Sequence, residues 1–211
     1  MAADSRSRLP DPPLLLVTDR QQARKAVEAV VAEALDAGCR WVMLREKDLS
    51  AGDQAVLARQ LHGLCRTKGA TLLVNGSAEA AAIAGGAHMQ QGASVGEART
   101  ALGAQALIGV SAHSLDEAEA ARRLGADYAT LSPVFLTDSK PGYGPALGLP
   151  GFAAIAGRVA LPLVALGGID AGSAAACRHA GAAGIAVMGT VMRSPHPGRT
   201  MRDLIAAWRN A

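Results

Sequence analysis

The sequence predicts a single-domain (β/α)8 TIM barrel, an α/β fold in which parallel strands alternate with helices. Short, fully apolar runs, typical of strands covered on both faces, alternate along the chain with segments of helical spacing. Eight such pairs fit within the 211 residues, and strict strand–helix alternation implies a parallel sheet with right-handed crossovers. The alternative is a doubly wound open sheet, but the first strand lacks the Gly-x-Gly-x-x-Gly turn of a dinucleotide site.

The expected strands follow one another along the whole chain, and each ends in polar residues or glycines. They are the runs 14–17, 41–44, 71–75, 86–89, 107–111, 128–134, 163–168 and 184–189. Apolar residues with helical spacing predict helices over 23–37, 50–68, 78–84, 94–102, 115–124, 152–157 and 171–180, and a last amphipathic segment over 201–208. A glycine closes several of these helices, as Gly38 closes the first.

Size and composition fit one soluble domain. Half of the residues are hydrophobic, so residues 14–211 can bury one large core, whereas residues 1–13 are polar and proline-rich and are expected to be a disordered lead. The net charge is only +3 without a basic cluster, which argues against a nucleic-acid partner. No run approaches the roughly 18 apolar residues of a membrane span, so no membrane partner is expected. Three separate cysteines and the lack of a signal-peptide core favour a cytoplasmic location.

Polar residues and glycines gather where the expected strands end. Because the carboxyl ends of barrel strands meet at one mouth, where active sites lie, these residues are candidates for one shared site. They are Asp19, Arg45, Lys47, Asn75, Gln90, Ser111, His113, Thr137, Asp138, Ser139, Lys140, Gly167, Gly168, Gly189 and Thr190. Glycine turns after the seventh and eighth strands are the usual phosphate pocket of a barrel. The hydroxyls and the lysine of the loop 132–149 also suit phosphate oxygens, so we predict a phosphate-binding mouth.

Two residues could transfer a proton at this mouth. His113 is the histidine that follows a predicted strand, but it could equally belong to a helix cap, because Ser114 and Glu117 form a capping-box pattern. Asp138 could act as a general acid or base in a partly desolvated mouth, or it could be an ordinary loop carboxylate. His88 lies inside a predicted strand and is interpreted as structural.

Taken in order, these segments resemble the thiamine phosphate synthase/TenI family from Leu14 to Trp208. The matching segments are Val17-Thr18-Asp19, Leu44-Arg45-Glu46-Lys47, Gly109–His113, Pro133-Val134-Phe135 with Thr137, Ser139 and Lys140, Gly167-Gly168-Ile169, and Ala186–Gly189. The resemblance implies a (β/α)8 barrel with a role in thiamine biosynthesis and a phosphorylated thiazole as its small-molecule partner. It implies that Gly168, Gly189 and Thr190 hold the thiazole phosphate. In a synthase, the pyrimidine pyrophosphate would be cradled by Arg45, Lys47, Asn75, Ser111, Thr137, Ser139 and Lys140.

Two activities occur in this family, and residues at a few positions distinguish one from the other. The synthase joins a pyrimidine pyrophosphate to a thiazole phosphate and uses Mg²⁺, which carboxylates after the third and fourth strands hold. Here those places read Asn75-Gly76 and Gln90-Gln91-Gly92-Ala93, so both carboxylates are missing. Met43 also replaces a glutamine of the synthase. Asn75-Gly76 and the Thr137-Asp138-x-Lys140 pattern resemble TenI, the thiazole tautomerase, which needs an acid/base but no metal.

We therefore expect a metal-independent thiazole tautomerase, an isomerase without a cofactor. TenI carries its proton-transferring histidine at the sixth strand, where this chain reads Ser132-Pro133-Val134-Phe135, so His113 or Asp138 would have to substitute. The alternative is a thiamine phosphate synthase, a transferase, with Mg²⁺ as its cofactor. A further alternative is a protein that binds thiazole phosphate or thiamine phosphate without catalysis. The sequence leaves the oligomeric state open, with a homodimer among the options.

Overall fold

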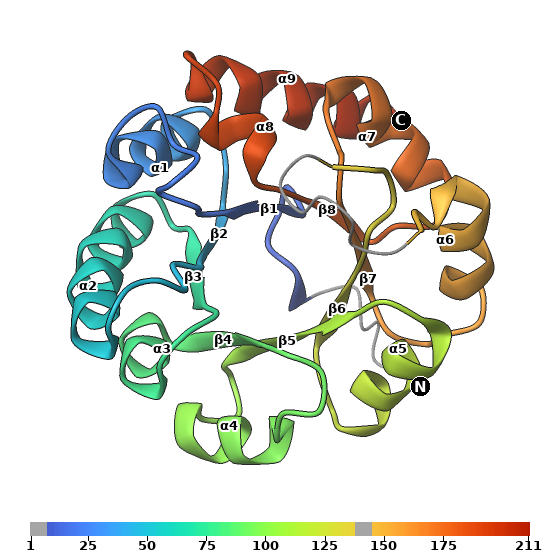
Figure 1. Cartoon of the computed structure of the whole chain (residues 1–211), viewed down its shortest axis with the longest axis horizontal. Helices are drawn as coiled ribbons and strands as arrows, with labels where there is room; N and C mark the ends of the chain where they lie inside the picture. Colours follow the sequence, from blue (N-terminus) through green and yellow to red (C-terminus); the bar gives the residue numbers. More distant parts are fainter. Residues whose placement is uncertain (1–7, 138–144) are drawn as a thin grey trace.

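Within residues 8–137 and 145–211, which the computed structural model describes, eight parallel strands close into a barrel in sequence order (Figure 1). The predicted fold class is thus confirmed. The strands are β1 (Leu14–Val17), β2 (Trp41–Leu44), β3 (Thr71–Val74), β4 (Gly86–Met89), β5 (Leu107–Ala112), β6 (Tyr128–Leu131), β7 (Leu163–Leu166) and β8 (Gly184–Val187). Pairing of β8 with β1, which sets Ala186 opposite Leu15, closes the ring.

Helices surround the barrel on its outside (Figure 1). They are α1 (Val27–Asp36), α2 (Ala51–Thr67), α3 (Ala78–Ala84), α4 (Val95–Leu102), α5 (Leu115–Arg123), α6 (Gly148–Ala156), α7 (Ala171–His179), α8 (Gly189–Met192) and α9 (Pro197–Arg209). Serine caps begin four of them: the hydroxyls of Ser50, Ser77, Ser94 and Ser114 accept a hydrogen bond from a first-turn amide. This local signal explains why the sequence located the starts of these helices to within one residue.

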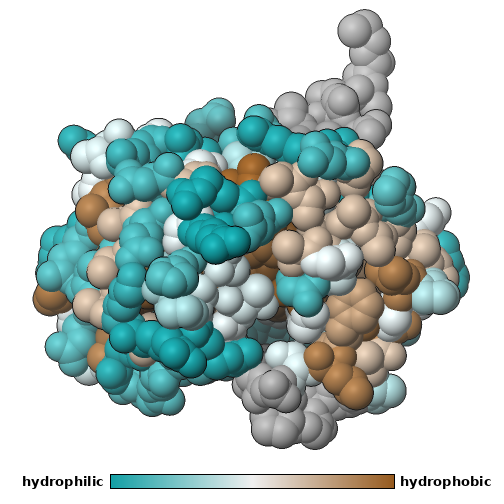
Figure 2. Space-filling model, turned by 90° about the horizontal axis from the view of Figure 1, so that it is seen from above, coloured by the Kyte–Doolittle hydropathy of each residue, from teal (hydrophilic) through white to brown (hydrophobic). Residues whose placement is uncertain are grey.

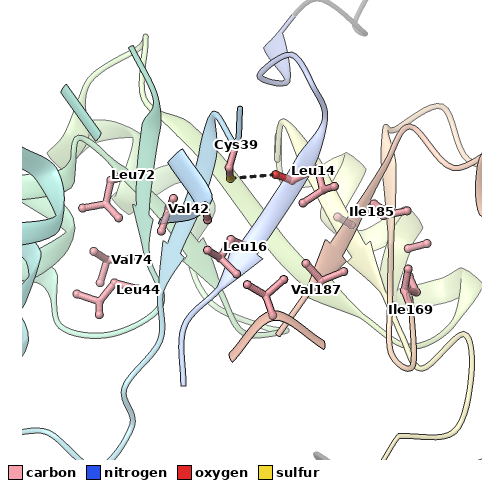
Figure 3. Close-up of a cluster of buried hydrophobic side chains, with 14 of the residues drawn as sticks. Leu14, Leu16, Cys39, Val42, Leu44, Leu72, Val74, Ile169, Ile185 and Val187 are labelled. Atoms are coloured by element: carbon pink, nitrogen blue, oxygen red, sulfur yellow. Dashed lines mark hydrogen bonds between the residues drawn. The ribbon is translucent and has the colours of Figure 1, made fainter. Parts of the chain in front are cut away.

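Side chains of the strands alternate between two apolar layers. Figure 3 shows part of the outer layer, in which Leu14 and Leu16 of β1 lie with residues of the neighbouring strands under the helices. Leu15 and Val17 of the same strand belong to the inner layer, which fills the barrel. The inner layer comprises Leu15, Val17, Trp41, Met43, Leu73, Leu107, Tyr128, Val164 and Ala186. The barrel interior is therefore a packed core, as expected for this fold.

The inner layer depends on one large aromatic pair. The rings of Trp41 and Tyr128 meet edge to face, with centroids 4.8 Å apart and an angle of 72° between their planes. Gly109 of β5 leaves the space that Tyr128 occupies, because a Cβ at this position would overlap the phenol ring. The glycine in the fifth strand is thus explained by packing across the barrel.

Several boundaries differ from those that the sequence predicts. The eighth strand was expected to run to Gly189, and α8 was not expected, because a helix of four residues is too short to show helical periodicity. α9 begins at Pro197, four residues before the predicted start; proline suits the first turn of a helix. β6 ends at Leu131 rather than Val134. The amide of Val134 then donates to the carbonyl of Leu166, which ends β7, and the amide of Phe135 donates to that of Gly167.

Residues 8–13, part of the expected disordered lead, lie against the barrel at the start of its strands. Arg8 forms an ion pair with Asp127, which precedes β6 and also pairs with Arg99. The carbonyl of Pro13 accepts a hydrogen bond from the amide of Ile185 at 3.0 Å. These long-range contacts carry no signature in the local sequence. Residues 1–7 of the lead lie outside the described residues.

The last helix, α9, lies on the outside of the barrel between α1 and α7. α9 packs against α1 and α7 and buries Met201, Leu204, Ile205 and Trp208. The guanidinium of Arg178 lies over the ring of Trp208, 5.7 Å from its centroid. Figure 2 views the molecule from this side and shows hydrophilic residues across much of the surface. In residues 8–137 and 145–211, no helix is both long and apolar enough to cross a membrane.

A candidate active site at the mouth of the barrel

A cavity of about 580 Å³ opens at the carboxyl ends of the strands, and each of the eight strands or the turn after it contributes to its lining. This volume is within the range of small-molecule sites. The lining includes the predicted site residues Arg45, Lys47, Asn75, Ser111, His113, Thr137, Gly168, Gly189 and Thr190. Gln90 and Gly167 line it as well, whereas Asp138, Ser139 and Lys140 lie outside the described residues. Of the described candidates that the sequence selected one by one, Asp19 does not line the cavity, and all the others share it.

The cationic part of the lining follows β2. Arg45 and Lys47 line the cavity, whereas Glu46 between them is buried. Both carboxylate oxygens of Glu46 accept hydrogen bonds from the amide of Arg20, at 3.1 and 3.0 Å. Burial raises the pKa of Glu46 above its usual value. Glu46 thus holds the loop after β1, and its two neighbours are left for a ligand.

Asn75 follows β3 beside this cationic part. Its Nδ2 donates to the carbonyl of His88 at 2.6 Å, which fixes the amide between β3 and β4. The next residue is Gly76, where a Cβ would overlap the side-chain amide of Gln54. Gln54 is held in place because its Nε2 donates to the carbonyl of Glu46 at 3.1 Å and its Oε1 accepts from the amide of Ser77 at 2.8 Å. Position 76 therefore has no room for a carboxylate while Gln54 keeps this place.

His88 of β4 lies where the cavity meets the inner layer of the barrel. Its Nδ1 is 2.9 Å from the hydroxyl of Tyr128, and its Nε2 is 3.0 Å from Oγ of Ser111. Burial lowers the pKa of His88 to about 3, and the charge of Arg45 acts in the same direction, so the imidazole is neutral at pH 7. The sequence interpretation of His88 as purely structural missed its place in the cavity lining. The sequence signal that could have identified His88 as a lining residue is that it is a polar side chain at an inward-facing strand position.

His113 lines the cavity after β5. Its Nδ1 is 2.8 Å from the carbonyl oxygen of Ser132. Because a carbonyl oxygen only accepts, Nδ1 is the donor in this contact. The amide of His113 donates to Glu117 at 2.7 Å, and Ser114 caps α5. The ring of His113 thus lines the cavity, while its backbone belongs to the helix cap that the sequence offered as the other interpretation.

Two glycine turns form another part of the lining, after β7 and β8. Gly167 and Gly168 have φ of +105° and +64°, and a Cβ at Gly168 would lie 2.5 Å from the carbonyl oxygen of Leu136. α8 begins at Gly189; the amides of Val191 and Met192 donate to the carbonyl of Met188, whereas those of Gly189 and Thr190 precede the first hydrogen bonds of the helix. The hydroxyl of Thr190 donates to the carbonyl of Ile169 at 2.7 Å and ties the two turns together. Thr190 therefore has its backbone amide, rather than its hydroxyl proton, to offer to a ligand.

Arg193 also lines the cavity, although no sequence motif pointed to it. It follows α8 directly, and its guanidinium folds back over the first residue of that helix. A Cβ on Gly189 would lie 2.6 Å from Cζ of Arg193. Since the approach depends on a helix of only four residues, no sequence pattern announces it.

The described donor set of the cavity does not fit a metal held by the protein. Among the described residues, no group of three or more His, Cys, Asp or Glu side chains is placed to hold an ion. The ends of β3 and β4 offer amides, beside two cationic side chains. Asp170, the one carboxylate in the described lining, already accepts hydrogen bonds at Oδ1 from the amide and hydroxyl of Ser173, both at 3.0 Å. Mg²⁺ prefers carboxylate oxygens, which these strand ends lack.

Comparison with known proteins gives a consistent result. A family model described as thiamine monophosphate synthase matches residues 14–191. The thiamine-phosphate synthase of Chloroflexus aurantiacus is 39% identical over 197 residues, which cover 92% of this chain and 91% of that protein. The one of Azorhizobium caulinodans is 37% identical over 203 residues, which cover 93% and 96%. The solved structure of a thiamine phosphate pyrophosphorylase from Pyrococcus furiosus matches with a TM-score of 0.84 at 28% identity and covers 97% of this chain and 98% of that one.

These relatives correct the activity expected from the sequence. The prediction of a thiazole tautomerase is wrong, because proteins 34–39% identical over most of the chain are named thiamine-phosphate synthase. The prediction depended on a few loop positions, chiefly Asn75-Gly76 and the two missing carboxylates. Loop side chains vary more readily than the scaffold that carries them, so they were a weak guide. The proton transfer assigned to His113 and Asp138 belonged to the tautomerase and is not carried forward.

Proposed function

The chain belongs to the thiamine monophosphate synthase family, and from this premise we propose that it is a thiamine-phosphate synthase, a transferase. The reaction joins hydroxymethylpyrimidine pyrophosphate to thiazole phosphate. The thiazole ring nitrogen forms a bond to the methylene carbon of the pyrimidine, the bond from that carbon to oxygen breaks, and pyrophosphate leaves with the bonding electrons. The observation that carries the proposal is that cationic side chains and glycine turns line different parts of one cavity.

The glycine turns suit the phosphate of the thiazole. Gly168, Gly189 and Thr190 bring backbone to the cavity surface, and the amides of Gly189 and Thr190 precede the first hydrogen bonds of α8. Backbone amides after the seventh and eighth strands are the usual phosphate ligands of a barrel. We assign the phosphomonoester to this part of the cavity.

The cationic part suits the pyrophosphate. Arg45 and Lys47 supply positive charge after β2, and Asn75 and Ser111 supply neutral hydrogen-bonding groups from β3 and β5. Negative charge grows on the pyrophosphate as the carbon–oxygen bond breaks, so cations placed there stabilise the transition state more than the bound substrate. Thr137 lines the same cavity, and Ser139 and Lys140, outside the described residues, are assigned to the same role. The described donors do not fit a metal ion, so these side chains are assigned the stabilisation of the leaving group.

The interior below the substrates is apolar or neutral. Met43 stands where a synthase glutamine was expected, and Val17 and Leu166 line the cavity beside it. A poorly hydrated floor strengthens the interaction of the anionic substrates with the charges around them. It also limits access of water to the reactive pyrimidine carbon.

The direct test is a discontinuous assay on the purified chain. Hydroxymethylpyrimidine pyrophosphate and thiazole phosphate are supplied together, and thiamine phosphate and pyrophosphate are both quantified. We expect the two products in a one-to-one ratio, at a rate that depends on both substrates. Folded protein that forms no thiamine phosphate above the uncatalysed background would refute the proposal.

A further inference from the structure

Three side chains form a connection across the seam between β8 and β1. Asp19 follows β1, and its Oδ1 accepts a hydrogen bond from the amide of Gln22 at 3.3 Å. Its Oδ2 accepts from Nε2 of Gln22 at 2.5 Å. The Oε1 of Gln22 accepts in turn from the guanidinium of Arg193. The loop after β1 is also joined to α8 through its backbone, because the amide of Arg24 donates to the carbonyl of Met192 at 3.2 Å.

The two ends of this connection fix the orientation of the amide between them. A carboxylate accepts hydrogen bonds and a guanidinium donates them, so neither can exchange its role. Gln22 must therefore turn its NH2 group to Asp19 and its oxygen to Arg193. A flipped amide would set donor against donor on one side and acceptor against acceptor on the other. Arg193 is thus positioned by a neutral group whose own orientation is determined.

The hydrogen bond to Gln22 holds the guanidinium of Arg193 at the glycine turns. A Cβ on Gly189 would lie 2.6 Å from both Cζ and Nη2 of Arg193, so glycine is the residue that leaves room for the side chain. Arg193 lines the cavity together with Gly168 and Thr190. A planar guanidinium can meet two phosphate oxygens at once, which a lysine or a backbone amide cannot do.

We infer that Arg193 is a specificity-determining residue of this site, whose guanidinium binds the phosphate of the thiazole substrate and makes the enzyme select the phosphorylated thiazole over the free alcohol. The inference rests on the proposed function and adds a charged side chain to the backbone amides assigned there. The anion is the phosphomonoester rather than the pyrophosphate, because Arg193 lies against the turn after β8 and the pyrophosphate is assigned to the residues after β2 and β3.

The test measures the activity of two Arg193 variants with two thiazole substrates. Arg193→Gln removes the charge at similar length, and Arg193→Lys keeps the charge without the planar fork. Each protein is assayed with thiazole phosphate and with the unphosphorylated thiazole alcohol. We expect Arg193→Gln to raise KM for thiazole phosphate about 10- to 100-fold, as for loss of a charged hydrogen bond, and to change kcat/KM for the alcohol less than about threefold. Arg193→Lys should recover part of the loss.

Arg199→Gln is the matched control. Arg199 is exposed on α9 and 4.0 Å from Asp203, so its replacement should leave both substrates unaffected. A role for Arg193 that is only structural would lower activity equally with both thiazoles, and that result would overturn the inference. A rise in KM for the pyrimidine pyrophosphate alone would also overturn it, since it would assign Arg193 to the other anion.

Direct binding separates this inference from the proposed reaction. Calorimetry with thiazole phosphate alone needs no turnover, and the same variants can be compared. Weaker binding to Arg193→Gln with unchanged binding to Arg199→Gln supports the inference even if no thiamine phosphate is formed. Equal affinity of wild type and Arg193→Gln, with both proteins folded by circular dichroism, would refute it even if the synthase reaction proceeds.

Discussion

The imidazole Nε2 of His88 lies 3.0 Å from Oγ of Ser111, and this contact joins the packed interior of the barrel to its open mouth. On the other side of the ring, Nδ1 contacts the hydroxyl of Tyr128. Burial lowers the pKa of His88 to about 3 and raises that of Tyr128 well above its usual value, so both groups are neutral at pH 7. A neutral, hydrogen-bonded network under the cavity leaves the recognition of anions to the residues around its mouth.

The depressed pKa of His88 predicts a loss of stability in acid. In the unfolded chain its pKa returns to about 6.5, so below that pH the unfolded state binds the proton more readily than the folded state. The contribution to the free energy of unfolding is fully present above pH 6.5 and falls as the pH drops toward 3. At about 1.4 kcal/mol per pH unit, we expect a loss on the order of 3 kcal/mol between pH 7 and pH 4, measured by urea unfolding.

His88→Gln should lose most of this pH dependence, whereas His179→Gln, at an exposed position on α7, should keep it. Should His88→Gln fail to fold, NMR titration of the wild-type imidazoles answers the same question. A signal of His88 that titrates near pH 6.5 in the folded protein would contradict the account.

Arg45→Gln should impair the reaction with little effect on folding. The guanidinium is assigned to the departing pyrophosphate, and loss of one electrostatic contributor typically lowers the rate about 100- to 1000-fold. Steady-state kinetics should show this loss in kcat/KM for the pyrimidine pyrophosphate. Lys68→Gln provides the control, because Lys68 follows α2 and pairs with Asp36 away from the mouth. Equal activity of the two variants would show that Arg45 does not stabilise the departing pyrophosphate.

Gly168→Ala should damage the phosphate turn. Gly168 has φ of +64°, and its Cβ would lie 2.8 Å from Cβ of Phe135, so an alanine must strain or displace the turn. We expect the free energy of unfolding to fall by about 1–3 kcal/mol, and KM for thiazole phosphate to rise. Gly172→Ala in the first turn of α7 has ordinary space around it, with Oδ1 of Asp170 at 3.4 Å. It should be neutral or slightly stabilising, and a similar loss in both variants would speak against the packing argument.

The wild-type protein should not bind Mg²⁺ by itself. Gln54 occupies the space beside Gly76 where a carboxylate would stand, and in the part of the chain that the structure describes no acidic cluster faces the cavity. Calorimetric titration of Mg²⁺ into the protein without substrates should give no saturable heat up to about 1 mM, since the ion keeps its waters unless carboxylates or phosphates replace them. One-to-one binding in the micromolar range would show that a metal site exists.

The barrel followed from the sequence because its signals are local. Runs such as Leu14–Val17 are apolar throughout, and glycines and serine caps mark the helix ends, so eight strands could be located before any contact was known. α8 could not, because its four residues are too few to show helical periodicity. The contacts of Arg8 and Arg193 were also invisible, since their partners Asp127 and Gln22 are 119 and 171 positions away.

The candidate site was found through the same regularity. Strand ends converge in a barrel, so polar residues after each strand were expected to meet, and Arg45, Ser111 and Gly168 do line one cavity. The activity was wrongly predicted because the missing carboxylates placed the tautomerase ahead of the synthase, which was kept as the alternative. Charge on a departing pyrophosphate can also be offset by arginine and lysine side chains, which the chain supplies at Arg45 and Lys47.

The most direct test of where the two anions bind is a crystal structure of the protein with thiamine phosphate and pyrophosphate, the two products of the proposed reaction. We predict the phosphate of thiamine phosphate within about 3 Å of the amides at Gly168 and Gly189, with Arg193 beside it, and the pyrophosphate at Arg45 and Lys47. The reverse arrangement, or both anions bound outside the mouth of the barrel, would contradict it.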